Sequence, residues 1–325
     1  MQKKLCEEID LCVFILSMNR PEFLEQAVKS VLEQNKKPKQ IIILDNGSKL
    51  AVKKRIRKYL KKNNILWIGS TKQRSPIWNT QRTYNRTKCK YIYIMHDDDR
   101  LISNFIEKQI SFLENNPRII AIGCNAYLID KTGKRIGTLV MDNHRQNKKV
   151  FVYNTIFEII QLYSKGNLIP FSSIVYRTEN WNKAKIKKRY GPPSDSVFIC
   201  DLLDQGSIAF QNLKLYEYRI HEGQATNYVE EKYFERREQY FLERISKEHP
   251  LYNDILNNIR KTKTRRNLNN WKWKFIKKKN ITNFFSILNI INNSWFIKSE
   301  IFYFICDQLV SLINITEKTK IKMKW

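Results

Sequence analysis

The segment YIYIMHDDDRLI, Tyr91 to Ile102, places three consecutive aspartates directly after a short apolar run. A run of this length, bounded by polar residues, is typical of a strand that is covered on both faces. Adjacent carboxylates repel one another, so Asp97, Asp98 and Asp99 destabilise the fold unless a cation lies among them. Aspartates at the carboxyl ends of parallel strands are often functional, and a solvated acidic turn is the alternative interpretation.

The sequence before this segment alternates between strand and helix patterns. Three further strands are predicted at short apolar runs: Leu11–Ser17, Gln40–Leu44 and Ile65–Gly69. Asn19, as a cap, and Pro21 indicate the start of a helix after the first run, and further helices are predicted at 51–62 and from about residue 77. This order predicts an α/β fold with a Rossmann-like, mostly parallel sheet flanked by helices.

Composition limits the class of protein. The chain has 325 residues, 42% of them hydrophobic, which is enough for one large domain with an appendage or for two domains. Its net charge of +28 indicates an anionic partner, such as nucleic acid, an acidic membrane face or a phosphorylated substrate. The six cysteines are scattered without a Cys-x-x-Cys pair, which fits a reducing cytoplasm better than a zinc site or disulfides.

Several motif classes are missing from the sequence. No G-x-G-x-x-G follows the first strand and no G-x-x-x-x-G-K-[ST] occurs, which argues against a dinucleotide-binding enzyme and a P-loop NTPase. The N-terminus does not match a signal peptide, and the longest uncharged run, 280–297, contains five asparagines and is too polar for a membrane span.

Six motifs, in order, resemble the family 2 glycosyltransferases of GT-A fold. They are VFILSMNRPEFLEQAVKSVLEQ, IIILDNGS, PIWN, YIYIMHDDDRLI, PPSDSVFICDLLDQGSIAF and LYEYRIHEGQATN. The resemblance implies a catalytic domain at 1–227, with a nucleotide-sugar half at about 1–100 and an acceptor half at about 101–227. A basic and aromatic, mainly helical region at 228–325 lies outside it.

In such an enzyme the aspartate cluster serves as a metal and ribose site. The resemblance implies a DxD-type motif that holds Mn²⁺ or Mg²⁺ on the donor diphosphate. Alignment from the strand puts His96 and Asp98 at the two acidic positions, and Asp97-x-Asp99 is the alternative register. We assign Asp97 and Asp98 to donor binding, and Asp98 and Asp99 to the metal.

Further donor contacts are implied at other strand ends. Asp45 corresponds to the family aspartate that accepts a hydrogen bond from a uracil or thymine ring, although an ordinary Asn-Gly turn also explains this motif. Ser17 and Asn19 are expected across the base through backbone contacts. Asn79 corresponds to a position near the donor, with a helix cap as the alternative.

Two later motifs supply the reacting groups. Asp195 matches the general base that deprotonates the acceptor hydroxyl for an inverting displacement, with Ser194 where the family usually has Glu. A helix cap is the alternative role for Asp195. Arg219 and His221 form an Arg-x-His pattern expected to close over the diphosphate, with His221 also reaching the metal.

The sequence therefore predicts transfer of a sugar from a UDP- or dTDP-linked donor to a glycan acceptor. By analogy with the family, the acceptor is lipid-linked and the pathway is surface polysaccharide (O-antigen or capsule) biosynthesis. Arg260–Lys279 carries ten basic and no acidic residues, interleaved with Trp271 and Trp273. We expect this segment to bind an anionic membrane surface at the cytoplasmic face, and a helical bundle packed on the catalytic domain is the alternative.

The same segment also motivates a different class of function, a nucleic-acid-binding protein. No RRM, KH or zinc-finger pattern accompanies it, and the acidic cluster would repel a nucleic-acid backbone. We therefore expect no nucleic-acid partner. The motifs specify neither the sugar nor the oligomeric state.

Overall fold

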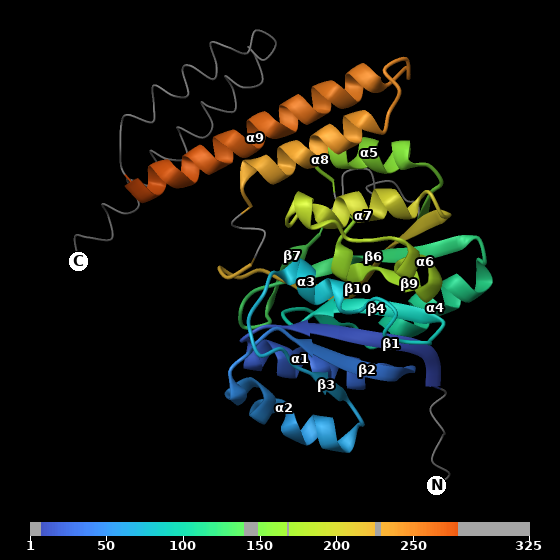
Figure 1. The fold of residues 1–325 in the computed structure, drawn as a ribbon, viewed down its shortest axis with the longest axis vertical. Coiled ribbons are helices and arrows are strands. Elements are labelled where there is room, and N and C mark those ends of the chain that lie inside the picture. Colours follow the sequence, from blue (N-terminus) through green and yellow to red (C-terminus); the bar gives the residue numbers. More distant parts are fainter. Residues whose placement is uncertain (1–7, 140–148, 168, 225–228, 279–325) are drawn as a thin grey trace. The chain divides into compact units, whose positions relative to one another are not determined.

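The computed structural model describes residues 8–139, 149–167, 169–224 and 229–278, with side chains described up to residue 267 (Figure 1). The chain divides into two compact units, Met1–Ile259 and Arg260–Trp325. The first unit thus extends beyond the boundary that the sequence predicted at residue 227.

One mixed sheet of ten strands runs through the described part of the first unit. Its first four strands are parallel and adjacent, in the order β3 (Leu66–Ile68), β2 (Lys37–Asp45), β1 (Glu8–Ser17) and β4 (Tyr91–His96). The four strands predicted from apolar runs are confirmed. The runs of β1, β2 and β4 are buried, whereas β3, at the edge of the sheet, is partly exposed. This order positions the carboxyl ends of β1, β2 and β4 side by side.

Beyond β4 the sheet is mixed rather than mostly parallel. β9 (Val175–Arg177) runs antiparallel to both β4 and β6 (Ile119–Ile129), and β6 pairs in parallel with β10 (Ser207–Arg219). Three short antiparallel strands complete it: β5 (Arg100–Leu101), β7 (Arg135–Thr138) and β8 (Val150–Tyr153).

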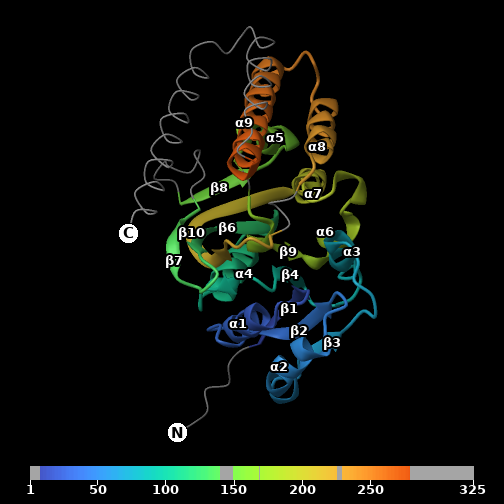
Figure 2. The ribbon, with the colours of Figure 1, turned by 90° about the vertical axis from the view of Figure 1, so that its left-hand side faces the viewer.

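Helices cover both faces of this sheet (Figures 1 and 2). Alternate residues of β1 separate the two layers, since Val13 packs in one apolar cluster and Phe14 in the other. The Val13 layer includes residues of α1 (Pro21–Leu32), α2 (Leu50–Lys62) and α4 (Phe105–Asn115). The Phe14 layer includes residues of α5 (Ile156–Ser164), α6 (Thr178–Lys183), α7 (Ser194–Leu202) and α8 (Glu231–Glu243).

The start of α1 differs from the expectation, whereas α3 begins within one residue of the predicted position. Asn19 does not cap α1, because it adopts a left-handed φ of 55° and its side-chain oxygen accepts the Lys49 N–H at 2.9 Å. Arg20 occupies the cap position without a side-chain cap bond. α3 (Pro76–Gln81) is short and is capped by Ser75, whose hydroxyl accepts the Trp78 N–H.

The C-terminal part of the first unit packs on the sheet through apolar residues. Tyr240 and Phe241 of α8 are buried, as are Ile255 and Ile259 at the start of α9 (Tyr252–Lys278). These residues belong to the Phe14 layer, which explains why the unit continues to Ile259.

The predicted membrane-binding features lie mostly outside the described residues. The backbone of the basic segment is helical up to Lys278, but the side chains of Trp271 and Trp273 and all of 279–325 are not described. None of the helices in the described ranges combines the length and the apolarity that a membrane crossing needs.

Candidate active site

The candidate site lies at the carboxyl edge of the parallel strands. Ser17 pairs with Asp45 in the register of β1 and β2, and Leu16 pairs with His96 in the register of β1 and β4. The residues that follow these strands therefore meet at one edge of the sheet, where ligands bind in open α/β folds.

Asp97 anchors the acidic cluster to the turn after β1. Its side chain is fully buried, and one carboxylate oxygen accepts the Met18 N–H at 2.9 Å. The other oxygen lies 2.9 Å from a guanidinium nitrogen of Arg20. Burial raises the pKa of Asp97 above its usual value, although the Arg20 charge opposes this.

Asp98 and Asp99 have different surroundings. The Asp98 Oδ2 atom contacts both Arg20 and His221, whose Nε2 lies 3.0 Å away. Burial would raise the pKa of Asp98, but the His221 hydrogen bond and the Arg20 charge outweigh it and lower the pKa. Asp99 Oδ1 accepts the Arg219 N–H at 3.1 Å, while its buried Oδ2 makes no hydrogen bond within the described chain.

The cluster thus contains carboxyl groups whose pKa values are shifted in opposite directions. Burial and the neighbouring Asp98 charge raise the pKa of Asp99 well above its usual value. Asp98 keeps its charge with the help of Arg20 and His221. A cation placed among these carboxylates would favour the ionised form of all of them.

His96, Asp98 and Asp99 form a group that could hold a metal ion. Their potential ligand atoms lie within 4.8 Å of one another. Burial lowers the pKa of His96, which favours the neutral imidazole that a metal ligand requires. Its Nδ1 lies 3.1 Å from the Ser172 hydroxyl, and this contact orients the ring.

Asp45 lies at the end of β2, and one of its carboxylate oxygens is available to accept a hydrogen bond. Its Oδ2 accepts the Ser48 N–H at 3.1 Å, and its Oδ1 is buried without a hydrogen-bond partner in the described residues. Gly47 closes the turn with a φ of 71°, and a Cβ there would meet the Gln73 nitrogen at 2.6 Å. The turn also contacts the neighbouring strand end, since Asn46 N–H donates to the Ser17 carbonyl.

Asn79 is buried beside the end of β2. Its amide nitrogen donates to the Leu44 carbonyl at 2.8 Å, and its oxygen accepts from Arg82, which also donates to the Asp45 carbonyl. Asn79 lies inside α3 and is not its cap. It is close to Asp45, but these contacts already occupy both its nitrogen and its oxygen.

Arg219 lies beside the cluster, and protein groups surround its guanidinium. The side chain is fully buried and donates to the carbonyls of Asp98 at 2.7 Å and Asp130 at 3.0 Å and to the Gln26 side chain at 2.8 Å. The backbone of the same residue supplies the N–H to Asp99. These contacts hold the turn that carries the aspartates.

Asp195 is the second residue of α7, and Pro193 occupies the cap position. Asp195 is therefore not the helix cap, and its Oδ1 accepts the N–H of Ser196 at 2.6 Å. Burial raises its pKa to about 6, although the Ser196 N–H and the Arg237 charge oppose the shift. A carboxyl group with this pKa suits a general base at neutral pH.

Phe171 connects the surroundings of Asp195 to the acidic cluster. Its ring stacks on His96 with a centroid distance of 6.4 Å and meets the edge of Phe198 at 6.2 Å. Phe198 follows Asp195 by three residues and so projects from a similar side of α7. No direct contact joins Asp195 to the aspartate cluster among the described interactions. The rings of His96, Phe171 and Phe198 form the packed connection between them.

Sequence reasoning missed Arg20 and the contact of Ser172 with His96, although the loop at 170–173 was expected near the donor. Arg20 contacts two of the three aspartates and lies 3.3 Å from His221 Nε2. Its position directly after the first strand, in SMNRP, was a usable signal because basic residues there share an edge with the aspartates. Ser172 gives no such signal, since it reaches His96 only through the tertiary fold.

Comparison with known proteins identifies the family. Residues 12–205 match the model of glycosyl transferase family 2, which covers more than half of the chain. The chain belongs to glycosyl transferase family 2. A glycosyltransferase of Methanocaldococcus jannaschii is 25% identical over 180 residues, covering 54% of this chain and 59% of the relative. The cholesterol galactosyltransferase of Borreliella burgdorferi is 23% identical over 208 residues, covering 63% and 58%. The chain thus spans less than two thirds of these two relatives.

Solved structures support the GT-A fold of this family 2 chain. The structure of S. aureus TarS 1–349 in complex with UDP-GlcNAc superposes with a TM-score of 0.59 at 14% identity, covering 77% of this chain and 71% of that chain. The complex of the same protein with UDP gives a TM-score of 0.58 at 13% identity, with 77% and 70% covered. The predicted fold and family are confirmed.

Proposed function

We propose that this enzyme transfers a sugar, with inversion, from a UDP- or dTDP-linked donor to a hydroxyl of a glycan acceptor. The observation that carries the proposal is a pair of buried carboxylate oxygens without partners, Asp45 Oδ1 and Asp99 Oδ2. The first is suited to accept the ring N–H of uracil or thymine, and the second is suited to face a cation. The UDP and UDP-GlcNAc bound by the TarS neighbours support a nucleotide-sugar donor.

The residues of the cluster fit a divalent cation. His96, Asp98 and Asp99 offer one nitrogen and two carboxylates in a compact group, and His221 lies against Asp98. Mn²⁺ or Mg²⁺ bound there would neutralise charge on the donor diphosphate. Arg20 adds a positive charge at the same place, while Asp97 holds the Met18 backbone that borders the base site.

The chain's own groups have separate tasks in this mechanism. Asp45, with the backbone of Ser17 and Asn19, binds the base of the donor, and Asn79 supports the wall beside it. Asp195 accepts the proton of the acceptor hydroxyl as the hydroxyl oxygen attacks the anomeric carbon, and the bond from that carbon to the diphosphate oxygen breaks, so that the nucleoside diphosphate leaves. Arg219 holds the aspartate turn through hydrogen bonds to backbone carbonyls. Arg20 contacts the donor phosphates, a role that the Arg-x-His pattern had suggested for Arg219.

The acceptor is proposed to be lipid-linked, in surface polysaccharide biosynthesis at the cytoplasmic face of the membrane. The family resemblance and the net charge of +28 support this, and one curated relative is named for a lipid acceptor, cholesterol.

A panel of nucleotide sugars tests the proposal. Release of nucleoside diphosphate is measured for each sugar with Mn²⁺, with Mg²⁺ and with a chelator. We expect one uridine or thymidine donor to be consumed only when metal is present. Full activity in excess chelator would contradict the metal site, and failure of every uridine and thymidine donor to bind would contradict the donor assignment.

A further inference from the structure

Helix α2 presents a strongly basic outer face. Seven of its thirteen residues are Lys or Arg, and none is acidic. Val52 and Ile56 are buried and hold the helix against the core. The opposite side carries four residues at helical spacing, here called the α2 stripe: Leu50, Lys54, Arg57 and Lys61.

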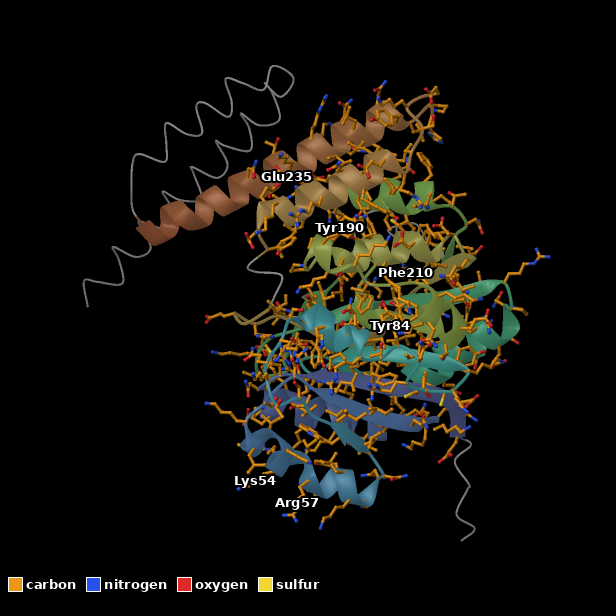
Figure 3. All side chains as sticks on the ribbon, viewed as in Figure 1. Lys54, Arg57, Tyr84, Tyr190, Phe210 and Glu235 are labelled. Atoms are coloured by element: carbon orange, nitrogen blue, oxygen red, sulfur yellow. The ribbon has the colours of Figure 1, made fainter. Side chains whose placement is uncertain are left out.

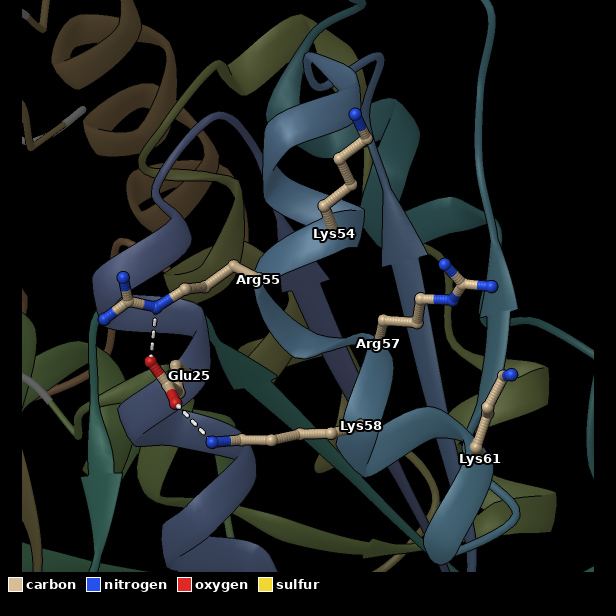
Figure 4. A pocket seen from close by; sticks show the side chains of 6 residues that line it. All are labelled: Glu25, Lys54, Arg55, Arg57, Lys58 and Lys61. Carbon is tan, nitrogen blue, oxygen red and sulfur yellow. Dashed lines mark hydrogen bonds and ion pairs between the residues drawn. The ribbon is translucent and has the colours of Figure 1, made fainter.

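The charge of this region is only partly neutralised within the protein. A cavity of about 570 Å³ beside the helix is lined by five of its cations and one carboxylate, Glu25 of α1. Glu25 binds Arg55 at 2.5 Å and Lys58 at 3.8 Å (Figure 4). Figure 4 shows Lys54 and Arg57 turned away from Glu25, and the cations of the α2 stripe form no ion pair with any described residue.

Stability of the fold alone does not account for this pattern. Like charges three or four residues apart destabilise a helix by roughly 0.2–0.5 kcal/mol per pair. Lys53 also lies in the first turn, where the helix dipole disfavours positive charge. Repulsion of this kind is relieved when an anionic surface lies against the helix.

We propose that the α2 stripe docks the enzyme on an anionic lipid surface. Leu50 is 66% exposed at the start of the helix. An exposed leucine at the start of a basic helix suits the interface of a bilayer, where apolar side chains enter between charged headgroups.

The aromatic residues of the same region favour lipid over nucleic acid as the partner. The Tyr59 hydroxyl donates to Glu25 at 3.1 Å, and the Lys53 ammonium lies 5.8 Å from the centre of the Trp67 ring. Both rings are therefore engaged within the protein, whereas binding of single-stranded nucleic acid relies on rings that are open to stacking.

Docking through α2 also suits the proposed acceptor, and in this respect the inference rests on the proposed function. β2 ends at Asp45 and α2 begins at Leu50, so the start of the helix lies at the edge of the sheet that carries the site. Lys54 and Arg57 project outward from this end of the molecule (Figure 3). A bilayer against the stripe would therefore lie near the donor-binding edge.

The test compares two full-length triple variants that lose the same charge. Lys54→Gln, Arg57→Gln and Lys61→Gln remove the α2 stripe, and the control changes three exposed cations elsewhere: Lys88→Gln, Arg118→Gln and Lys165→Gln. Binding to phosphatidylcholine vesicles, with and without about one third phosphatidylglycerol, is measured by co-sedimentation. UDP binding is measured in parallel, because neither variant touches the nucleotide site.

At about fivefold in affinity per cation, the α2 variant should bind the anionic vesicles roughly 10²-fold more weakly, and the control should change little. Soluble glycerol phosphate should not compete with the vesicles for binding. This result would distinguish a lipid surface from a free phosphate ligand. Equal losses in both variants, or none in the α2 variant, would overturn the proposal. Loss of oligonucleotide binding with unchanged vesicle binding would assign the stripe to nucleic acid instead. Absence of UDP binding in the unmodified enzyme would refute the proposed function and leave this result untouched.

Discussion

Replacing the proposed general base, Asp195→Asn, tests the chemical step separately from donor binding. The amide keeps the shape of the side chain but cannot take a proton from the acceptor hydroxyl. A general base contributes about 10²–10⁴-fold to turnover, which corresponds to roughly 3–5 kcal/mol of activation free energy. Donor affinity should stay within a few-fold of the unmodified enzyme, because no described contact joins Asp195 to the aspartate cluster.

The pH dependence gives a second measure of the same residue. Burial raises the pKa of Asp195 to about 6, so the unmodified enzyme should lose turnover about tenfold per pH unit below that value. The profile of the variant should lack this inflection. The assay is release of nucleoside diphosphate at saturating donor and acceptor across this pH range.

Stability distinguishes a catalytic loss from unfolding. A pKa raised by folding means that Asp195 stabilises the fold while protonated, and this contribution is lost as pH rises through about 6. Asp195→Asn should therefore not lower the free energy of unfolding at pH 7. Asp204→Asn, an exposed acid that pairs with Arg244, is the matched control and should leave turnover unchanged. Turnover of Asp195→Asn within about threefold of normal, or an inflection near pH 6 that persists in it, would refute the assignment.

Three further substitutions address the donor site. Asp99→Asn should weaken UDP binding about tenfold or more when Mn²⁺ is present and have little effect in chelator, as measured by calorimetry; an equal effect in both conditions would argue against a metal at this residue. Arg20→Met should lower the free energy of unfolding by about 1–3 kcal/mol, because buried Asp97 loses its counter-charge. The same variant should weaken UDP binding. Arg20→Lys should partly restore both the stability and the UDP affinity. Gly47→Ala should cost about 1–2 kcal/mol in chemical unfolding, since φ is 71° and a Cβ would meet Gln73; an unchanged midpoint would show that the turn can relax.

The sequence predicted the parallel half of the sheet well because its strands are continuous apolar runs, and those of β1, β2 and β4 are buried. The antiparallel strand β9 was not predicted, since Val175–Arg177 is only three residues long and its pairing depends on distant segments. Asn19 resembled a helix cap, but its side chain bonds across to Lys49 in a neighbouring loop. Such a bond between loops leaves no local pattern.

Site residues were predictable where they stand at strand ends and less so where their contacts depend on packing. The aspartates and Asp45 follow apolar strands, so position alone brings them to one edge. The sequence could not indicate that the Arg219 guanidinium bonds carbonyl groups while Arg20 contacts the carboxylates. Both are arginines beside the same cluster, and only the direction of their side chains distinguishes them.

The clamp formed by Asn46, Asn79 and Arg82 has a thermodynamic consequence. Asn46 holds Arg74 through two hydrogen bonds, at 2.7 and 2.9 Å, and Arg82 spans the carbonyls of Asp45 and Ile68. These bonds fix the walls beside Asp45 with main-chain groups of the protein itself, before any nucleotide arrives. The conformational entropy of this loop is therefore lost during folding and not during nucleotide binding. A nucleotide base at the proposed site beside Asp45 would then bind with little ordering of the chain.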